Sequence, residues 1–175
     1  MPINKDWILG FIESSGCFSL TFSSQNTCKL KYQITPVFAI TSKNLENLNR
    51  IKEFFGFGNV YAQKNSYIFR TKNLNEAKKI IKIFNENDFL SKKLDFAIWK
   101  KCIQLICNEE HLNKKGLLKI LFLRELLHKN KKSWNKKQFC LIRKEVSPCI
   151  IYIKKRTIPK LCDLCFKKPK IYLKC

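Results

Sequence analysis

The feature that most constrains this chain is the stretch Trp7–Gly16, which is almost continuously apolar up to Ile12 and then ends in two serines and a glycine. A helix of about ten residues that carries apolar side chains all round has to be buried on every side. Gly10 and Ser14 are four positions apart, so they share a helical face that a second helix can approach closely. Gly16 ends the helix. We therefore expect a buried helix with one face made for a partner.

The residues that follow alternate between strand and helix patterns. Residues 17–23 and 29–41 alternate apolar and polar side chains, which is typical of half-buried strands. Helical spacing over 44–55 is followed by a hairpin of strands 59–63 and 67–71, and by further helices over 74–85, 92–107 and 114–127. This order predicts an α+β domain in which helices cover one face of a four-stranded antiparallel sheet.

The second face of this sheet is expected to be polar. Antiparallel sheets often leave one face in solvent, so this pattern is also that of an ordinary solvated surface. The residues expected on it, and the candidates for binding a ligand there, are Ser19, Thr21, Lys29, Lys31, Gln33, Thr35, Tyr61, Gln63, Ser66 and Arg70.

The charge of the chain indicates a polyanionic partner. Among 175 residues, 35 are Lys or Arg and 13 are Asp or Glu, which gives a net charge of +22. Solubility requires far less, whereas nucleic acid attracts such a protein strongly. No apolar run reaches about 18 residues, so we expect no membrane partner.

Composition also bears on where the protein is made. Lys, Ile, Asn and Phe are abundant, and their codons are rich in A and T, which suggests an AT-rich organellar genome. The apolar helix begins so early that no cleavable targeting segment is expected. We therefore expect an organelle-encoded protein, with the mitochondrial matrix favoured.

Residues 10–18, Gly-Phe-Ile-Glu-Ser-Ser-Gly-Cys-Phe, resemble the LAGLIDADG motif of homing endonucleases and intron maturases. Residues 56–60 resemble the family's G-x-G-x-V, and the stretches 89–96 and 111–117 resemble its later motifs, so the resemblance covers roughly residues 6–132. It implies a homing endonuclease-like fold whose sheet forms a saddle over a duplex. It also implies a C2 homodimer through Gly10 and Ser14, because one motif copy is present, unless another macromolecule covers that face.

The sequence departs from the family where the resemblance implies catalysis. The family holds its metal with an acidic residue just before the final glycine, but Ser15 stands there and lacks the anionic oxygen that Mg²⁺ prefers. The resemblance assigns assisting roles to the Ser14 carbonyl, to Ser42 and to Lys93, although Lys93 is equally compatible with an ordinary surface lysine. Glu13 lies about 200° around the helix from Ser15 and is expected to point elsewhere. We expect a degenerate site without a cofactor; Mg²⁺ would be needed only if Glu13 replaced the lost ligand.

Residues 133–175 are expected to form a basic, cysteine-containing extension of a nucleic-acid-binding domain over residues 1–132. From residue 129 onward, 15 Lys and Arg stand against two acids, a balance of +13. Tyr152, Phe166 and Tyr172 are interleaved with the basic clusters, which is the composition of a surface that contacts phosphates and stacks on bases; a disordered basic tail has the same composition. The basic candidates are Lys154, Lys155, Arg156, Lys167, Lys168 and Lys170.

Four cysteines in this extension could bind zinc as a tetrahedral set of thiolates. A strong zinc signature has two Cys-x-x-Cys pairs, but only one is present, so no metal site is expected. The four candidates are Cys149, Cys162, Cys165 and Cys175.

These observations predict a catalytically degenerate LAGLIDADG-fold protein that binds structured RNA. The RNA is either an organellar ribosomal RNA, bound next to ribosomal proteins, or an intron, as for a maturase. Two alternatives stay open: an active DNA homing endonuclease with displaced metal ligands, and a sequence-specific DNA-binding regulator that does not cut.

Overall fold

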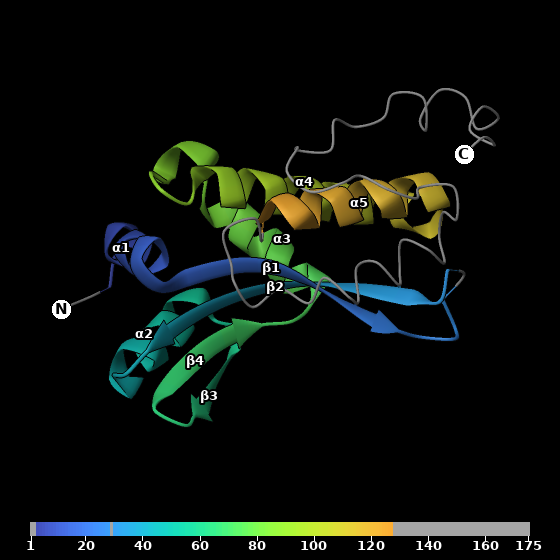
Figure 1. Ribbon diagram of the computed structural model, residues 1–175. Coiled ribbons are helices and arrows are strands. Elements are labelled where there is room, and N and C mark those ends of the chain that lie inside the picture. The colour runs from blue at the N-terminus through green and yellow to red at the C-terminus, as the bar shows by residue number, and fades with distance from the viewer. Residues whose placement is uncertain (1–2, 29, 128–175) are drawn as a thin grey trace, which may run out of the picture.

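The computed structural model describes residues 3–28 and 30–127 of the chain. One antiparallel sheet forms a layer with the helices on one side of it, and its strands have the spatial order β1-β2-β4-β3 (Figure 1). The predicted four-stranded sheet is thereby confirmed. Its strands are β1 (Gly16–Ser24), β2 (Tyr32–Ser42), β3 (Asn59–Gln63) and β4 (Ser66–Thr71).

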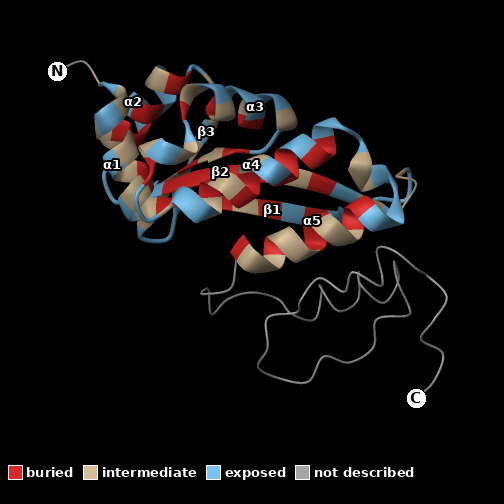
Figure 2. Ribbon diagram, turned by 90° about the horizontal axis from the view of Figure 1, so that it is seen from above, coloured by how far each residue is buried: buried red, intermediate tan, exposed pale blue. Residues whose placement is uncertain are grey.

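The helices cover one face of this sheet, as expected (Figure 2). Helix α2 packs against β2 and β4, α4 and α5 pack against β1, and α1 packs where β1 begins and β2 ends. Within the described ranges, no helix is long and apolar enough to span a membrane. The helices are α1 (Lys5–Ser15), α2 (Leu45–Phe55), α3 (Leu74–Ile83), α4 (Lys93–Cys107) and α5 (Lys114–Leu127), with short 3-10 turns η1 (Glu86–Asp88) and η2 (Glu110–Leu112).

Asparagine side chains start four of the helices; at α5 the Asn113 side-chain oxygen accepts the Gly116 N–H at 2.7 Å. The side-chain oxygens of Asn4, Asn44 and Asn73 accept hydrogen bonds from backbone N–H groups in the first turns of α1, α2 and α3. Such caps satisfy donors that have no partner within the helix. Helix α3 ends at Ile83, two residues before the predicted end, because Asn85 instead caps η1, and its N–H donates to the Asp88 carboxylate at 2.9 Å.

An aromatic cluster joins the sheet to the helices. The Phe18 ring of β1 lies 5.2 Å from the Phe38 ring of β2 and 5.4 Å and 5.2 Å from the rings of Phe96 and Trp99 in α4. The indole N–H of Trp99 donates to the Ser19 carbonyl at 3.1 Å, so the polar atom of this buried side chain is satisfied. These contacts fix which face of β1 is covered.

Two connections differ from the prediction in detail. Strand β2 begins at Tyr32, because Lys31 has φ of 60° and its N–H bonds to the Cys28 carbonyl in a tight turn. The β3–β4 hairpin turns over Lys64 and Asn65 alone, so Ser66 is the first residue of β4 and pairs with Gln63. Lys29 and the extension from residue 128 onward lie outside the described residues.

Candidate nucleic-acid interface

The face of the sheet opposite the helices is mainly polar, although Val37 and Ala39 on it are buried, and strand register brings its residues together. Thr21 pairs with Thr35, and Gln63 pairs with Ser66. Paired residues of antiparallel strands project to the same side, and alternate residues along a strand do too. The expected binding residues that share this face are Ser19, Thr21, Gln33, Thr35, Tyr61, Gln63, Ser66 and Arg70.

Other polar residues of this face were missed by the sequence analysis. Ser23 pairs with Gln33, Asn59 pairs with Arg70, and all of Ser23, Asn59 and Thr41 are exposed. The same alternation that identified their neighbours would have found them, since each lies at an even spacing from an identified residue on its own strand.

The chemistry of the face suits an interface with nucleic acid. Its strands present hydroxyl and amide groups, and among its described residues Arg70 is the only charged side chain. The Arg70 Nε is buried and makes no hydrogen bond with any described group. Lysines stand at the strand ends instead, with Lys31 before β2, Lys43 after β2 and Lys64 in the hairpin turn. Hydroxyls and amides can bond to base edges, while lysines at the rim contact phosphates.

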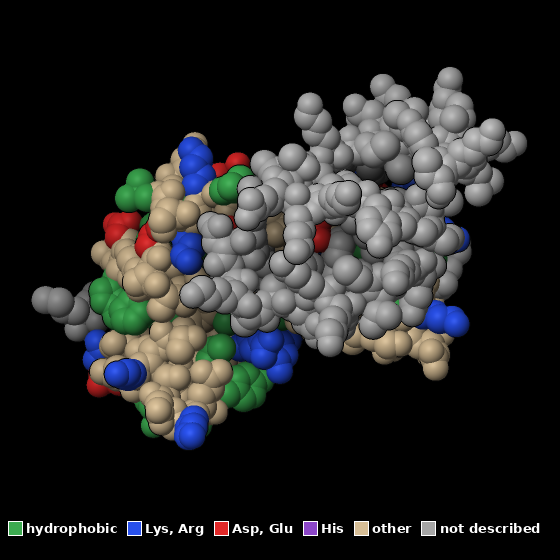
Figure 3. Space-filling model, in the orientation of Figure 1, with side chains coloured by type: hydrophobic (Ala, Val, Ile, Leu, Met, Phe, Trp, Pro, Cys, Tyr) green, Lys and Arg blue, Asp and Glu red, His purple; other side chains and the backbone are tan. Residues whose placement is uncertain are grey.

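Basic side chains are also distributed beyond this face. Figure 3 shows Lys and Arg over several elements of the visible surface rather than in one patch. The six basic candidates from Lys154 to Lys170 lie outside the described residues, as do Cys149, Cys162, Cys165 and Cys175.

Helix α1 is buried on one side only. Ile8 and Ile12 are fully buried against the core, whereas Gly10 and Ser14 are exposed. A Cβ atom added at Gly10 would meet no atom within 4 Å. The prediction of burial on every side is therefore wrong for the single chain, because no other described element covers this face. The face is open to a second helix.

The last turn of α1 carries two serines where the resemblance implies metal chemistry. The hydroxyls of Ser14 and Ser15 both donate to the Phe11 carbonyl, each at 3.1 Å. Gly16 follows, and a Cβ there would lie 2.5 Å from the Ile12 carbonyl oxygen, so the tight passage from helix to strand requires glycine. Neither serine supplies an anionic oxygen.

Ser42, the residue expected to assist, has another partner. It pairs with Tyr67 on the helix-covered side of β2, and its hydroxyl accepts the Asn44 N–H at 3.0 Å. Extending the Gly16–Ile40 pair by one position instead sets Thr41 opposite Ser15. Alternation along β2 would have favoured Thr41 over Ser42.

Glu13 holds the segment that precedes α4. Its carboxylate accepts hydrogen bonds from the Leu90 N–H at 2.7 Å, from the Ser91 N–H at 3.0 Å and from the Ser91 hydroxyl. Burial alone would raise the pKa of Glu13, but these hydrogen bonds outweigh it, and the pKa lies below the ordinary 4.5. Lys93 begins α4 two residues later and is exposed. These bonds, the Glu13 clamp, thus tie the segment before Lys93 to the end of α1.

The groups at the end of α1 do not fit a Mg²⁺ ion, which prefers anionic oxygen ligands. The serine hydroxyls are neutral and donate to a carbonyl, and both carboxylate oxygens of Glu13 are engaged by the Leu90–Ser91 segment. Nowhere in residues 3–28 and 30–127 do three or more His, Cys, Asp or Glu side chains gather to hold a metal.

We predict that Glu13→Gln loosens the segment before α4. The amide keeps one acceptor but loses the charge, and a charge-assisted hydrogen bond contributes on the order of 1.5–3 kcal/mol. Hydrogen exchange at Leu90 and Ser91 should therefore quicken, whereas Glu53→Gln, on the exposed side of α2, should leave it unchanged. Equal exchange in both variants would refute the clamp.

The clamp should also depend on pH. Because folding lowers the pKa of Glu13, its stabilising effect is complete above pH 4.5 and is lost as the pH falls through the lower pKa of the folded protein. In the wild type, protection of Leu90 and Ser91 should fall in that acidic range. In Glu13→Gln this step should be absent.

A family model described as LAGLIDADG endonuclease matches residues 8–103. The probable intron-encoded endonuclease Cox1-I1b of Schizosaccharomyces pombe is 33% identical over 110 residues, which are 61% of this chain and 28% of that protein. An uncharacterized 50.9 kDa protein in ND4 intron 1 of Podospora anserina is 28% identical over 114 residues, 62% of this chain and 25% of that protein. The chain thus spans about a quarter of the length of these relatives.

Solved structures share the fold. The homing endonuclease I-TnaI superimposes with a TM-score of 0.75 at 27% identity, over 83% of this chain and 99% of its own. The archaeal intron-encoded homing endonuclease I-Vdi141I, complexed with DNA, gives a TM-score of 0.74 at 32% identity, over 81% of this chain and 93% of its own. The LAGLIDADG meganuclease I-CpaMI, bound to uncleaved DNA, gives a TM-score of 0.68 at 28% identity, over 89% of this chain and 56% of its own. With the matched motif region and this fold, the chain belongs to the LAGLIDADG endonuclease family.

Proposed function

We propose that this chain binds nucleic acid through its polar sheet face without cleaving it, and that structured RNA is its main ligand. The observation that carries the proposal is the state of the α1 end. Ser15 replaces the acidic ligand, and the Glu13 carboxylate is committed to Leu90 and Ser91. No carboxylate at the end of α1 is then left to hold a metal for cleavage, while the sheet face keeps its hydrogen-bonding groups. No cofactor is needed for this role.

The preference for RNA rests on the basic extension. Residues 129–175 carry a balance of +13 with aromatic residues between the basic clusters. Folded RNA offers unpaired bases for stacking, whereas a DNA duplex offers few. We infer that the RNA is an organellar ribosomal RNA, bound beside ribosomal proteins, or an intron. Relatives named for a Cox1 intron and an ND4 intron support an organellar origin, with the mitochondrial matrix favoured.

An active DNA endonuclease is the second candidate. Relatives named as endonucleases favour it, and I-Vdi141I and I-CpaMI are bound to DNA. It would need a metal ligand that the α1 end does not supply. Incubation with Mg²⁺ and DNA carrying the intron homing site decides the matter, since double-strand cutting would overturn our proposal.

A second copy of the chain is the proposed partner of the open α1 face. The chain matches nearly all of I-TnaI but only 56% of I-CpaMI, so the longer chain has room for a second such unit. Gly10 and Ser14 leave space for a close helix on this face.

We predict that Gly10→Leu separates such a dimer without unfolding the chain. A leucine at Gly10 meets open space in the single chain but would wedge two helices apart. Light scattering should show the mass of a monomer, whereas Asn49→Leu, on the exposed side of α2, should keep the mass of a dimer. A variant mass equal to that of the wild type would refute this interface.

We predict that Ser15→Asp introduces Mg²⁺ binding. The new carboxylate would stand at the family's metal position, although a helix C-terminus disfavours negative charge by about 0.3–1 kcal/mol. Calorimetry should detect Mg²⁺ binding to Ser15→Asp but not to Ser14→Asp or to the wild type. Equal Mg²⁺ binding by all three proteins would contradict the loss of a ligand at Ser15.

The RNA preference is tested by competition on the full chain. Intron or ribosomal RNA should displace a labelled RNA far better than a DNA duplex of equal length. Truncation after Lys132 should remove roughly five phosphate contacts and flatten the slope of log K against log salt by about four units. Equal competition by DNA, together with an unchanged slope after truncation, would refute the RNA proposal.

A further inference from the structure

A groove on the helical side of the molecule is not used by the proposed function. It lies between α3 and α4, has a volume of about 500 Å³, and belongs to the layer that covers the opposite face of the sheet from the polar one. Ile81 and Ile103 line its apolar part, and Gln104 adds an exposed amide. The groove is therefore a second concave surface, separate from the sheet face.

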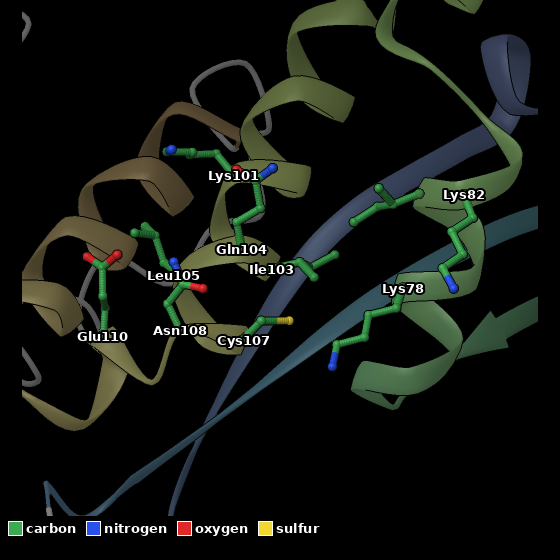
Figure 4. Close-up of a pocket in the computed structure, with 10 residues that line it drawn as sticks. Lys78, Lys82, Lys101, Ile103, Gln104, Leu105, Cys107, Asn108 and Glu110 are labelled. Atoms are coloured by element: carbon green, nitrogen blue, oxygen red, sulfur yellow. The ribbon is translucent and has the colours of Figure 1, made fainter.

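Lysines border this groove on both sides. Lys78 and Lys82 come from α3, and Lys101 extends from α4 on the other side of Ile103 (Figure 4). Across the described part of the chain, no acidic side chain pairs with any of the three. Glu110 is the only acid among the groove's described lining residues, and it already pairs with Lys119 at 3.8 Å.

Two of these lysines repel each other along α3, although Lys82 also lies in the last turn, where a positive charge favours the helix. Lys78 and Lys82 are four positions apart in α3, so two like charges stand side by side on one helical face. Their neighbours behave differently: Lys79 lies over the Phe57 ring, and Lys100 pairs with Glu86. Lys78, Lys82 and Lys101 thus line the groove without an acidic partner among the described side chains. Exposed lysines elsewhere in the described part of the chain, such as Lys52 and Lys114, also lack such a partner. An anionic ligand in the groove would neutralise the three groove charges together.

We propose that this groove binds a single-stranded segment of RNA. Three lysines on two rims match a chain of phosphates, and the partly exposed Ile81 side chain between them can contact a base. A cavity of about 500 Å³ is the size of a small-molecule pocket and does not admit a duplex. The inference rests on the proposed function, since it gives one folded RNA a second contact, through an unpaired stretch, on the far side of the sheet.

The test compares two variants of the full chain with equal loss of charge. The groove variant carries Lys78→Gln, Lys82→Gln and Lys101→Gln. The control variant carries Lys52→Gln, Lys114→Gln and Lys115→Gln, all exposed lysines of α2 and α5 outside the groove. The probes are a uridine oligoribonucleotide and a blunt RNA duplex of the same length. Thermal unfolding of both variants verifies that each is folded.

Binding of the oligoribonucleotide should weaken in the groove variant. Three single-strand phosphates at about 0.7 each flatten the slope of log K against log salt by about two units, a loss of about a hundredfold at roughly 0.1 M salt. The affinity of the control variant for the oligoribonucleotide should fall by less than about tenfold. The affinity for the RNA duplex should change by equally little in both variants. Equal losses in the two variants, or an equal loss for the duplex, would overturn the groove site.

A second measurement locates the RNA directly. A photo-crosslinking residue at Gln104 should capture the oligoribonucleotide, whereas the same residue at Asn49 of α2 should not. Absence of a crosslink at Gln104 would overturn the site even if affinity fell. The groove site and the RNA preference are tested separately, because the RNA preference is measured on the wild type alone. If RNA outcompetes DNA but the groove variant behaves like the control variant, only the groove site is refuted.

Discussion

The packing of Phe18 between the sheet and α4 is the contact on which the other features depend. Its ring touches Phe38 beside it and Phe96 and Trp99 above it, and Trp99 in turn bonds to the Ser19 carbonyl. Because side chains alternate along a strand, committing Phe18 to the helices commits Ser19 to the other face. The packing of Phe18 in the core therefore also determines which side chains of β1 form the polar face, and no further contact is needed to orient them.

At the end of α1, the residue that supports the fold and the residue at the position implied for metal binding are different. Glu13 serves the fold, because its carboxylate holds the N–H groups of Leu90 and Ser91. Ser15 stands where the resemblance to the family places a metal ligand, and it offers only a hydroxyl, which donates to the Phe11 carbonyl within the helix. A chain can lose the second carboxylate and keep its architecture, whereas losing the first would release the segment that leads into α4. Under the proposed function, this asymmetry would let the fold of an endonuclease bind nucleic acid without cutting it.

Neutral polar groups and lysines lie on different parts of the molecule, so under the proposed function different groups would distinguish bases and attract phosphates. The polar face carries neutral hydrogen-bonding groups with Arg70 among them, while lysines stand at strand ends and along the groove between α3 and α4. Neutral donors and acceptors distinguish bases, and lysines attract any phosphate backbone. A ligand that folds around the molecule can use both sides, which a straight duplex cannot do.

The sequence by itself determined the elements, the family and the polar face, because alternation, asparagine caps and glycine stops are local signals that act within a few residues. It also indicated that Glu13 points away from Ser15. Tertiary structure alone decided what Glu13 contacts, since Leu90 lies 77 positions away in the chain. It also decided that one side of α1 stays open and that Lys78 and Lys101 flank one groove, because such neighbours are set by how separate helices pack, which no local pattern records.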